Sequence, residues 1–87
     1  MPEPQRLGPK MTDGLRAYAE MEAERDQPGY ALVDERLMRM GYPRNMAYSI
    51  MERLSRRGWL DSGVSLRSGW LTEDGKAAAR VALGGHR

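Results

Sequence analysis

The segment between Pro43 and Gly58 constrains the fold most, because it combines an apolar stripe with residues that delimit helices. Its apolar residues recur three and four positions apart, at Ala47, Ile50, Met51 and Leu54. This spacing places them on one face of an α-helix. Pro43 fits the first turn of such a helix and Gly58 fits its end. The sequence therefore predicts a helix over 43–57 with one apolar and one polar side.

Two further helices are predicted before this segment. The first begins near Thr12 or Asp13, either of which can cap it, and runs to about Arg25, before the turn signal of residues 27–29. The second is short and covers about 31–40, with Gly41 as the residue that follows it. Only three or four residues separate it from the next helix, which is typical of a helix-turn-helix joint.

After Gly58 the period of the apolar residues changes. Two short apolar pieces, 59–60 and 70–71, flank a run that is rich in turn-forming residues. This pattern predicts a two-stranded hairpin with a small loop. We expect the two tryptophans, Trp59 and Trp70, to pair across the strands and to cover the core.

Thr72 is placed to cap a final helix that runs from Glu73 to about Leu83. Residues 1–10 are rich in proline and are predicted to form a flexible arm, and 84–87 a disordered tail. Residues 11–83 are predicted to form one domain, which suits a chain of 87 residues. The expected fold class is mainly α with a small β-hairpin, in the order helix, helix, helix, hairpin, helix.

Charge is distributed unevenly along the chain. Residues 13–35 contain seven acids and two arginines, whereas 36–57 contain six arginines and one acid, Glu52. All cations of the second block are therefore arginine, whose planar guanidinium matches phosphates and guanine edges. The block indicates either a solvated basic face or a nucleic-acid interface.

The composition excludes several classes of function. Without cysteine the chain has no disulfide, thiol catalysis or cysteine-based zinc site, and with one histidine, His86, a two-histidine metal site or a serine-protease triad is not expected. We expect that the protein is not an enzyme and that it has no catalytic residues, no cofactor and no metal. No apolar run approaches the roughly 20 residues that span a bilayer, and the N-terminus lacks the apolar core of a signal peptide. A cytoplasmic protein without membrane contact is expected.

Residues 40–60 resemble a winged helix-turn-helix domain, most like those of MarR-like and PadR-like bacterial transcription regulators. The resemblance rests on Met40-Gly41-Tyr42-Pro43, on the apolar spacing that follows, and on Ser55-Arg56-Arg57-Gly58-Trp59-Leu60. A second anchor is Leu71-Thr72-Glu73-Asp74-Gly75-Lys76, which is similar to the segment that enters the helix after the wing. Pro43 stands where the family usually has serine. The long helices that form the family's ligand-binding layers are missing or reduced, so no small-molecule ligand is inferred.

The resemblance implies a small transcriptional regulator that reads the major groove of double-stranded DNA with the helix at 43–57. The candidate base-reading or phosphate-binding side chains are Arg44, Asn45, Tyr48, Ser49 and Arg53. The candidate backbone contacts are Arg56, Arg57, Arg36 and Arg39. The hairpin at 61–70 would be the wing, and its cation Arg67 would enter the minor groove or touch a phosphate. A homodimer is expected, formed through the first and last helices, because one small module contacts little DNA.

Other interpretations remain open from the sequence alone. Asn45 can instead cap its helix, Tyr48 can pack under the second helix, and Glu52 is expected to pair with Arg56 or Arg53. The alternative function is a winged-helix interaction module whose basic block binds an acidic protein partner. Residues 37–42 also look like part of a ubiquitin-associated three-helix domain, but that fold has no strands and the hairpin argues against it.

Overall fold

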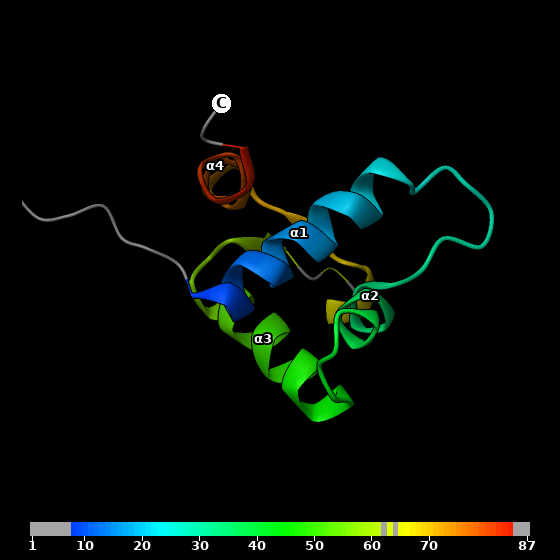
Figure 1. Ribbon diagram of the computed structural model, residues 1–87. Helices are drawn as coiled ribbons and strands as arrows, with labels where there is room; N and C mark the ends of the chain where they lie inside the picture. The colour runs from blue at the N-terminus through cyan, green and yellow to red at the C-terminus, as the bar shows by residue number, and fades with distance from the viewer. Residues whose placement is uncertain (1–7, 62, 64, 85–87) are drawn as a thin grey trace, which may run out of the picture.

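The computed structural model describes residues 8–61, 63 and 65–84. Its elements are α1 (Pro9–Ala23), α2 (Val33–Arg39), α3 (Arg44–Arg56), β1 (Leu60–Asp61), the 3-10 helix η1 (Leu66–Ser68), β2 (Trp70–Leu71) and α4 (Glu73–Gly84). The protein is thus mainly helical with one small two-stranded antiparallel sheet, as predicted (Figure 1). Among the described residues, no helix has the length and apolar character needed to cross a membrane.

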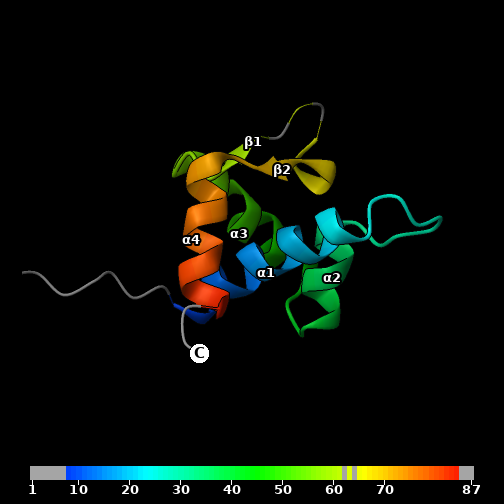
Figure 2. The ribbon, with the colours of Figure 1, turned by 90° about the horizontal axis from the view of Figure 1, so that it is seen from above.

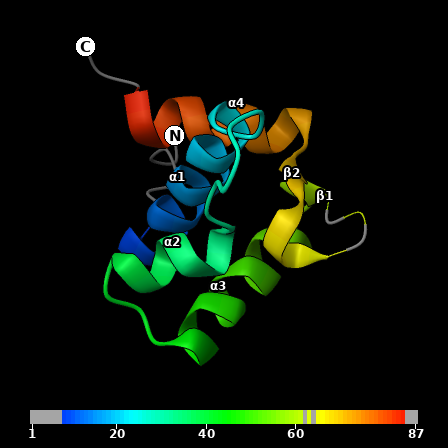
Figure 3. The same cartoon turned by 90° about the vertical axis from the view of Figure 1, so that its right-hand side faces the viewer.

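Helix α1 lies at the centre of the molecule. Figures 1 and 3 show α3 and α4 on opposite sides of it, with α2 beside α3. Leu15, Tyr18 and Met21 of α1 are completely buried. Because α1 is enclosed on three sides, it forms the middle of a single core to which every other element contributes side chains.

The contact between α1 and α3 confirms the predicted apolar stripe of α3. Its four apolar residues, Ala47, Ile50, Met51 and Leu54, are all buried. A Cβ atom at Gly14 of α1 would lie only 2.7 Å from Ile50 Cγ2 and 2.9 Å from Leu54 Cδ1. Gly14 therefore allows the two helices to approach closely.

The start of α1 differs from the prediction. The helix begins at Pro9 with Gly8 as its N-cap, not near Thr12 or Asp13. Proline has no amide hydrogen and a fixed φ, so it suits the first position of a helix. Asp13 instead accepts a hydrogen bond from the Tyr42 hydroxyl at 2.7 Å, which ties the turn after α2 to α1. Part of the expected arm is thus helical, and the remainder, 1–7, lies outside the described residues.

The other helix boundaries follow the sequence signals with small shifts. Gly41 and Gly58 have φ of 109° and 79°, the left-handed conformation expected after α2 and α3. Pro43 is the N-cap of α3 and not a residue of its first turn. Arg25 lies beyond the end of α1, and its guanidinium donates to the Gly69 carbonyl at 3.0 Å. Helix α4 ends at Gly84, and the rest of the expected tail lies outside the described residues.

The hairpin pairs Leu60 with Leu71 and Asp61 with Trp70 (Figure 2). The predicted cross-strand tryptophan pair is therefore wrong. Trp59 precedes β1 and its ring lies 4.5 Å from the Arg57 guanidinium carbon, whereas the Trp70 side chain is 44% exposed. The side chains that point from the strands into the core are leucines, because only Leu60 and Leu71 alternate onto the inner face.

The junction between the hairpin and α4 is held by Thr72 and Gly75. As predicted, Thr72 caps α4: its Oγ1 accepts from the Gly75 amide at 3.1 Å, and its hydroxyl donates to the Gly58 carbonyl at 2.8 Å. A Cβ atom at Gly75 would overlap the Trp59 carbonyl oxygen. This explains why glycine occupies the position where a capping box would carry glutamate or glutamine.

We predict that Gly75→Ala destabilises the protein by about 2 kcal/mol or more, because the methyl group must displace backbone atoms. Gly84→Ala, in the same helix and with nothing within 4 Å of the added Cβ, is the matched control and is expected to be close to neutral. Urea denaturation of both variants measures the difference. Equal stability of the two variants would contradict the close approach of α4 to Trp59.

A second prediction concerns Tyr18, whose hydroxyl donates to the Leu66 carbonyl at 2.6 Å and joins α1 to η1. Tyr18→Phe removes this donor and is expected to cost about 1 kcal/mol at neutral pH. Burial, with a smaller contribution from the charge of Asp34, raises the pKa of Tyr18. The unfolded chain therefore ionises first, and the stability that neutral Tyr18 contributes is lost as the pH rises above the ordinary value of 10.0.

The stability difference between the wild type and Tyr18→Phe should accordingly narrow above about pH 10. Urea denaturation at neutral and alkaline pH measures it. Tyr30→Phe is the control, since the Tyr30 hydroxyl makes no hydrogen bond within the described part of the chain. A difference that is independent of pH, or a Tyr30→Phe variant with the same behaviour, would contradict the prediction.

Candidate nucleic-acid interface

The outward side of α3 is the candidate interface. The helix lies at the edge of the molecule, away from α4, with its buried stripe against α1 and α2 (Figures 1 and 3). The exposed residues of α3 are Arg44, Asn45, Glu52, Arg53 and Arg56. Tyr48 and Ser49 are partly exposed. Together with Ser55, which is also partly exposed, one helix thus brings together eight polar or charged side chains that are accessible at least in part.

The structure decides two of the alternatives left open for α3. Asn45 does not cap the helix, because Pro43 is the N-cap and no side chain bonds to the helix end. Tyr48 packs partly against the core, so it presents only part of its ring to solvent. Asn45 is therefore free to act at the surface, whereas Tyr48 is partly committed to packing.

The expected ion pairs of Glu52 do not form. No salt bridge joins Glu52 to Arg53 or Arg56, all three of which the structure describes. Its carboxylate lies on the same exposed side of α3 as the arginines, and it would repel a phosphate that approached it. The face is therefore basic at its ends and carries one negative charge between them.

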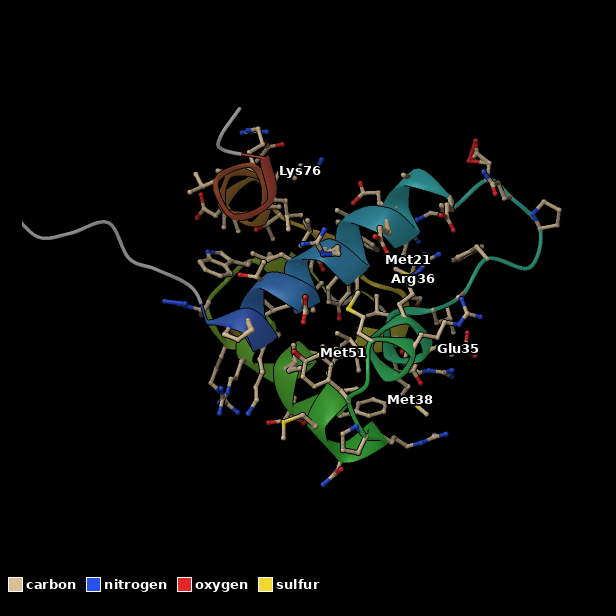
Figure 4. The ribbon with its side chains drawn as sticks, in the orientation of Figure 1. Met21, Glu35, Arg36, Met38, Met51 and Lys76 are labelled. Carbon is tan, nitrogen blue, oxygen red and sulfur yellow. The ribbon has the colours of Figure 1, made fainter. Side chains whose placement is uncertain are left out.

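Arg36, an expected backbone contact, has a different place. It is only 8% exposed, and its guanidinium donates to Glu24 Oε1 and to the Ala31 carbonyl, both at 2.9 Å (Figure 4). A second carboxylate, that of Glu20, lies 3.9 Å away. Arg36 thus joins α2 to the acidic side of α1, and its burial and these partners argue against the predicted backbone contact with DNA.

Arg67, the predicted wing contact, also has carboxylate partners within the protein. Its Nε donates to Asp34 Oδ1 at 3.0 Å, and Glu35 Oε2 lies 4.0 Å from its terminal nitrogen. The hydrogen bond to Asp34 and the charge of that carboxylate raise the pKa of Arg67. Asp34 is 2% exposed, so this pair neutralises a buried charge. The only cation of the segment 61–70 is therefore paired with a carboxylate of α2.

Four arginines of the basic block remain available. Arg39, Arg44, Arg53 and Arg56 are exposed, and within the described part of the chain none of them forms an ion pair. Arg39 ends α2 and Arg44 begins α3, so these two flank the turn between the helices. Arg57, also exposed, stacks over Trp59. The available cations therefore follow α3 from one end to the other.

The structure adds a feature that the sequence reasoning missed. Arg53, Arg56 and Arg57 line an open pocket of about 290 Å³ together with Met11 of α1. The spacing of the three arginines was a usable signal, because it places them on one side of the last helical turn. Met11 could not be assigned from the sequence, since only the packing of α1 on α3 brings it there.

A second pocket of about 320 Å³ lies between α1, β2 and α4 and is lined mainly by Ala19, Ala23, Leu71 and Ala79. Its charged borders are Glu22 on α1 and Lys76 and Arg80 on α4. Neither pocket contains a histidine or a nucleophile paired with a base. Among the residues that the structure describes, no group of three or more histidine, aspartate or glutamate side chains is placed to hold a metal ion.

Comparison of the chain with known protein families, with curated proteins and with solved structures finds no match.

We predict that Arg67→Gln lowers the melting temperature by several degrees, because it leaves the Asp34 carboxylate buried without its partner. Arg44→Gln, an exposed arginine without an ion pair, is the control and should leave the melting temperature unchanged. Thermal denaturation by circular dichroism measures both. The combination of Asp34→Asn with Arg67→Gln should cost less than the sum of the single changes. Strict additivity would show that the pair is not coupled.

Proposed function

We propose that this chain is a winged-helix DNA-binding protein, a small transcriptional regulator that inserts the outward side of α3 into the major groove of double-stranded DNA. Two independent features support the fold assignment. The order of elements and the short turn between α2 and α3 agree with the arrangement that the sequence resemblance implies. The hairpin that follows α3 and leads into α4 occupies the place of the wing.

The observation that carries the proposal is the separation of paired from unpaired arginines. Arg36 and Arg67 are held by carboxylates, whereas the arginines along α3 form no ion pairs within the described residues. A helix whose outward side carries several guanidinium groups without ion pairs is suited to a polyanion. Glu20 of α1 and Glu24, which follows that helix, pair with Arg36 and not with the arginines of α3.

The position of each side chain along α3 supports a division of roles. Arg44 and Asn45 lie in the first turn, where side chains of a recognition helix reach base edges, and they fit guanine and adenine respectively. Ser49, one turn further, is suited to a phosphate oxygen. Glu52 can accept a hydrogen bond from a cytosine amino group, so its unpaired carboxylate would favour some sequences over others.

The proposed complex differs from the one expected from the sequence in its use of the wing. Arg67 is bound to Asp34 and contributes no minor-groove contact. Binding therefore relies on α3 and on Arg39 beside its first turn. Because one small helix covers little DNA, we propose that two copies bind together, with α4 on the side away from the duplex.

The experiment is a selection of duplexes from a random pool by the purified protein, followed by binding measurements at two salt concentrations. We expect Arg44→Ala to weaken binding to the selected duplex by about tenfold and to relax its sequence preference, because each base-reading pair contributes roughly 1–3 kcal/mol. Arg80→Ala on α4 removes the same charge from another helix and is the matched control.

Two results would overturn the proposal. The first is a wild-type protein without affinity for any duplex at low salt. The second is equal effects of Arg44→Ala and Arg80→Ala, which would mean that α3 has no special part in binding. If binding to DNA is weak and nearly independent of salt, while an acidic protein binds the same face of α3, the function is that of a protein-interaction module.

A further inference from the structure

The pocket at the C-terminal end of α3 is lined by three arginines, which is more positive charge than contacts to DNA bases require. Arg53, Arg56 and Arg57 approach it from the last turn of α3 and the residue that follows. Met11 lines its other side, from the first turn of α1. The pocket therefore lies where two helices meet, at the opposite end of α3 from Arg44 and Asn45.

Three like charges at positions i, i+3 and i+4 repel one another. The negative end of the helix dipole explains why basic residues favour the last turn of α3, but it does not explain their convergence around one pocket. Within the described residues no carboxylate pairs with Arg53 or Arg56, and the neighbouring Glu52 does not do so either. The charges of Arg53 and Arg56 are therefore not offset by a carboxylate within the described residues, and an anion in the pocket would offset them.

Two further features suit the pocket to an anion. Met11 is the third residue of α1, so its backbone N–H belongs to the first turn, where amides lack acceptors within the helix. This end of α1 has no acidic residue in its first turn and no side-chain cap, so its partial positive charge is not offset there. On the other side, the Trp59 ring lies 4.5 Å from the Arg57 guanidinium carbon, which restricts the orientation of that group.

We propose that the pocket formed by Met11, Arg53, Arg56 and Arg57 is a phosphate-binding site. Guanidinium groups bind phosphate oxygens through paired, charge-assisted hydrogen bonds, and an open pocket lined by three of them matches one phosphate with several exposed oxygens. In a DNA complex it takes a backbone phosphate and sets the depth and register of α3 in the groove. The assignment of the phosphate to DNA rests on the proposed function, whereas the site itself does not.

The first test uses a free oligophosphate. Titration of the ¹⁵N-labelled full chain with sodium tripolyphosphate should give saturable shifts of the Met11 amide and of the arginine Nε signals of the pocket. Arg53→Gln with Arg56→Gln should weaken this binding about tenfold or more, because two charge-assisted contacts are lost. Arg16→Gln with Arg80→Gln removes two exposed arginines outside the pocket and should bind as the wild type does.

Shifts that are spread evenly over the exposed basic residues, or equal weakening by the two double variants, would overturn the phosphate site. Both double variants change only exposed side chains, and circular dichroism verifies that each remains folded. If Arg53→Gln with Arg56→Gln fails to fold, Arg56→Lys provides the test. It keeps the charge but loses the planar fork, and it should lower affinity for tripolyphosphate without a change in melting temperature.

The second test uses the duplex chosen by selection. Arg53→Gln with Arg56→Gln should reduce the salt dependence of binding by about one to two released counterions, while the preferred sequence remains the same. Duplex binding by the wild type with no effect of this variant on either ligand would overturn the phosphate site and leave the proposed function intact. Tripolyphosphate binding in the pocket without any duplex binding would have the opposite meaning: the site would stand, with a free oligophosphate as its ligand, and the DNA-binding function would fail.

Discussion

The burial of α1 is the constraint on which the rest of the structure depends. Leu15, Tyr18 and Met21 are removed from water by α2, α3 and α4 together, and full burial of a large apolar side chain contributes roughly 1.5–3 kcal/mol. Because α1 occupies the centre, α3 can bury only the one side that faces it. The other side of α3 is left to solvent, and its polar residues are therefore presented by a helix that the core holds in place.

Much of this arrangement could be predicted from the local pattern of residues. The apolar spacing of α3, the glycines after α2 and α3, and the cap of α4 all depend on neighbours within a few positions, so the sequence reveals them directly. The start of α1 could not be placed in this way, because Asp13 is used by Tyr42, which lies 29 positions away, and not as a cap. The predicted tryptophan pair was wrong for a similar reason, since the register of so short a hairpin is set by the leucines beneath it.

At the candidate site, too, the features set by nearby residues could be predicted, whereas those set by distant residues could not. Exposure of Arg44, Asn45, Arg53 and Arg56 follows from the apolar stripe on the opposite side of their helix, and it could be predicted. The ion pairs of Arg36 and Arg67 could not be predicted, because they depend on which carboxylates the fold brings near. A buried Asp34 requires a cation, and the loop of the hairpin supplies Arg67 from 33 positions away. A sequence with clustered arginines therefore indicates how much positive charge is present. It does not indicate how many of those arginines form ion pairs within the fold.

The hairpin has one more consequence, which concerns how copies of the chain can associate. Each of its strands contributes only two residues to the sheet. Longer exposed strand edges act as templates on which a second molecule can add its own backbone, a common route to aggregation. Edges this short offer too few amide and carbonyl groups for such growth. We therefore expect stable association of the described region to use contacts between side chains and not the addition of strands.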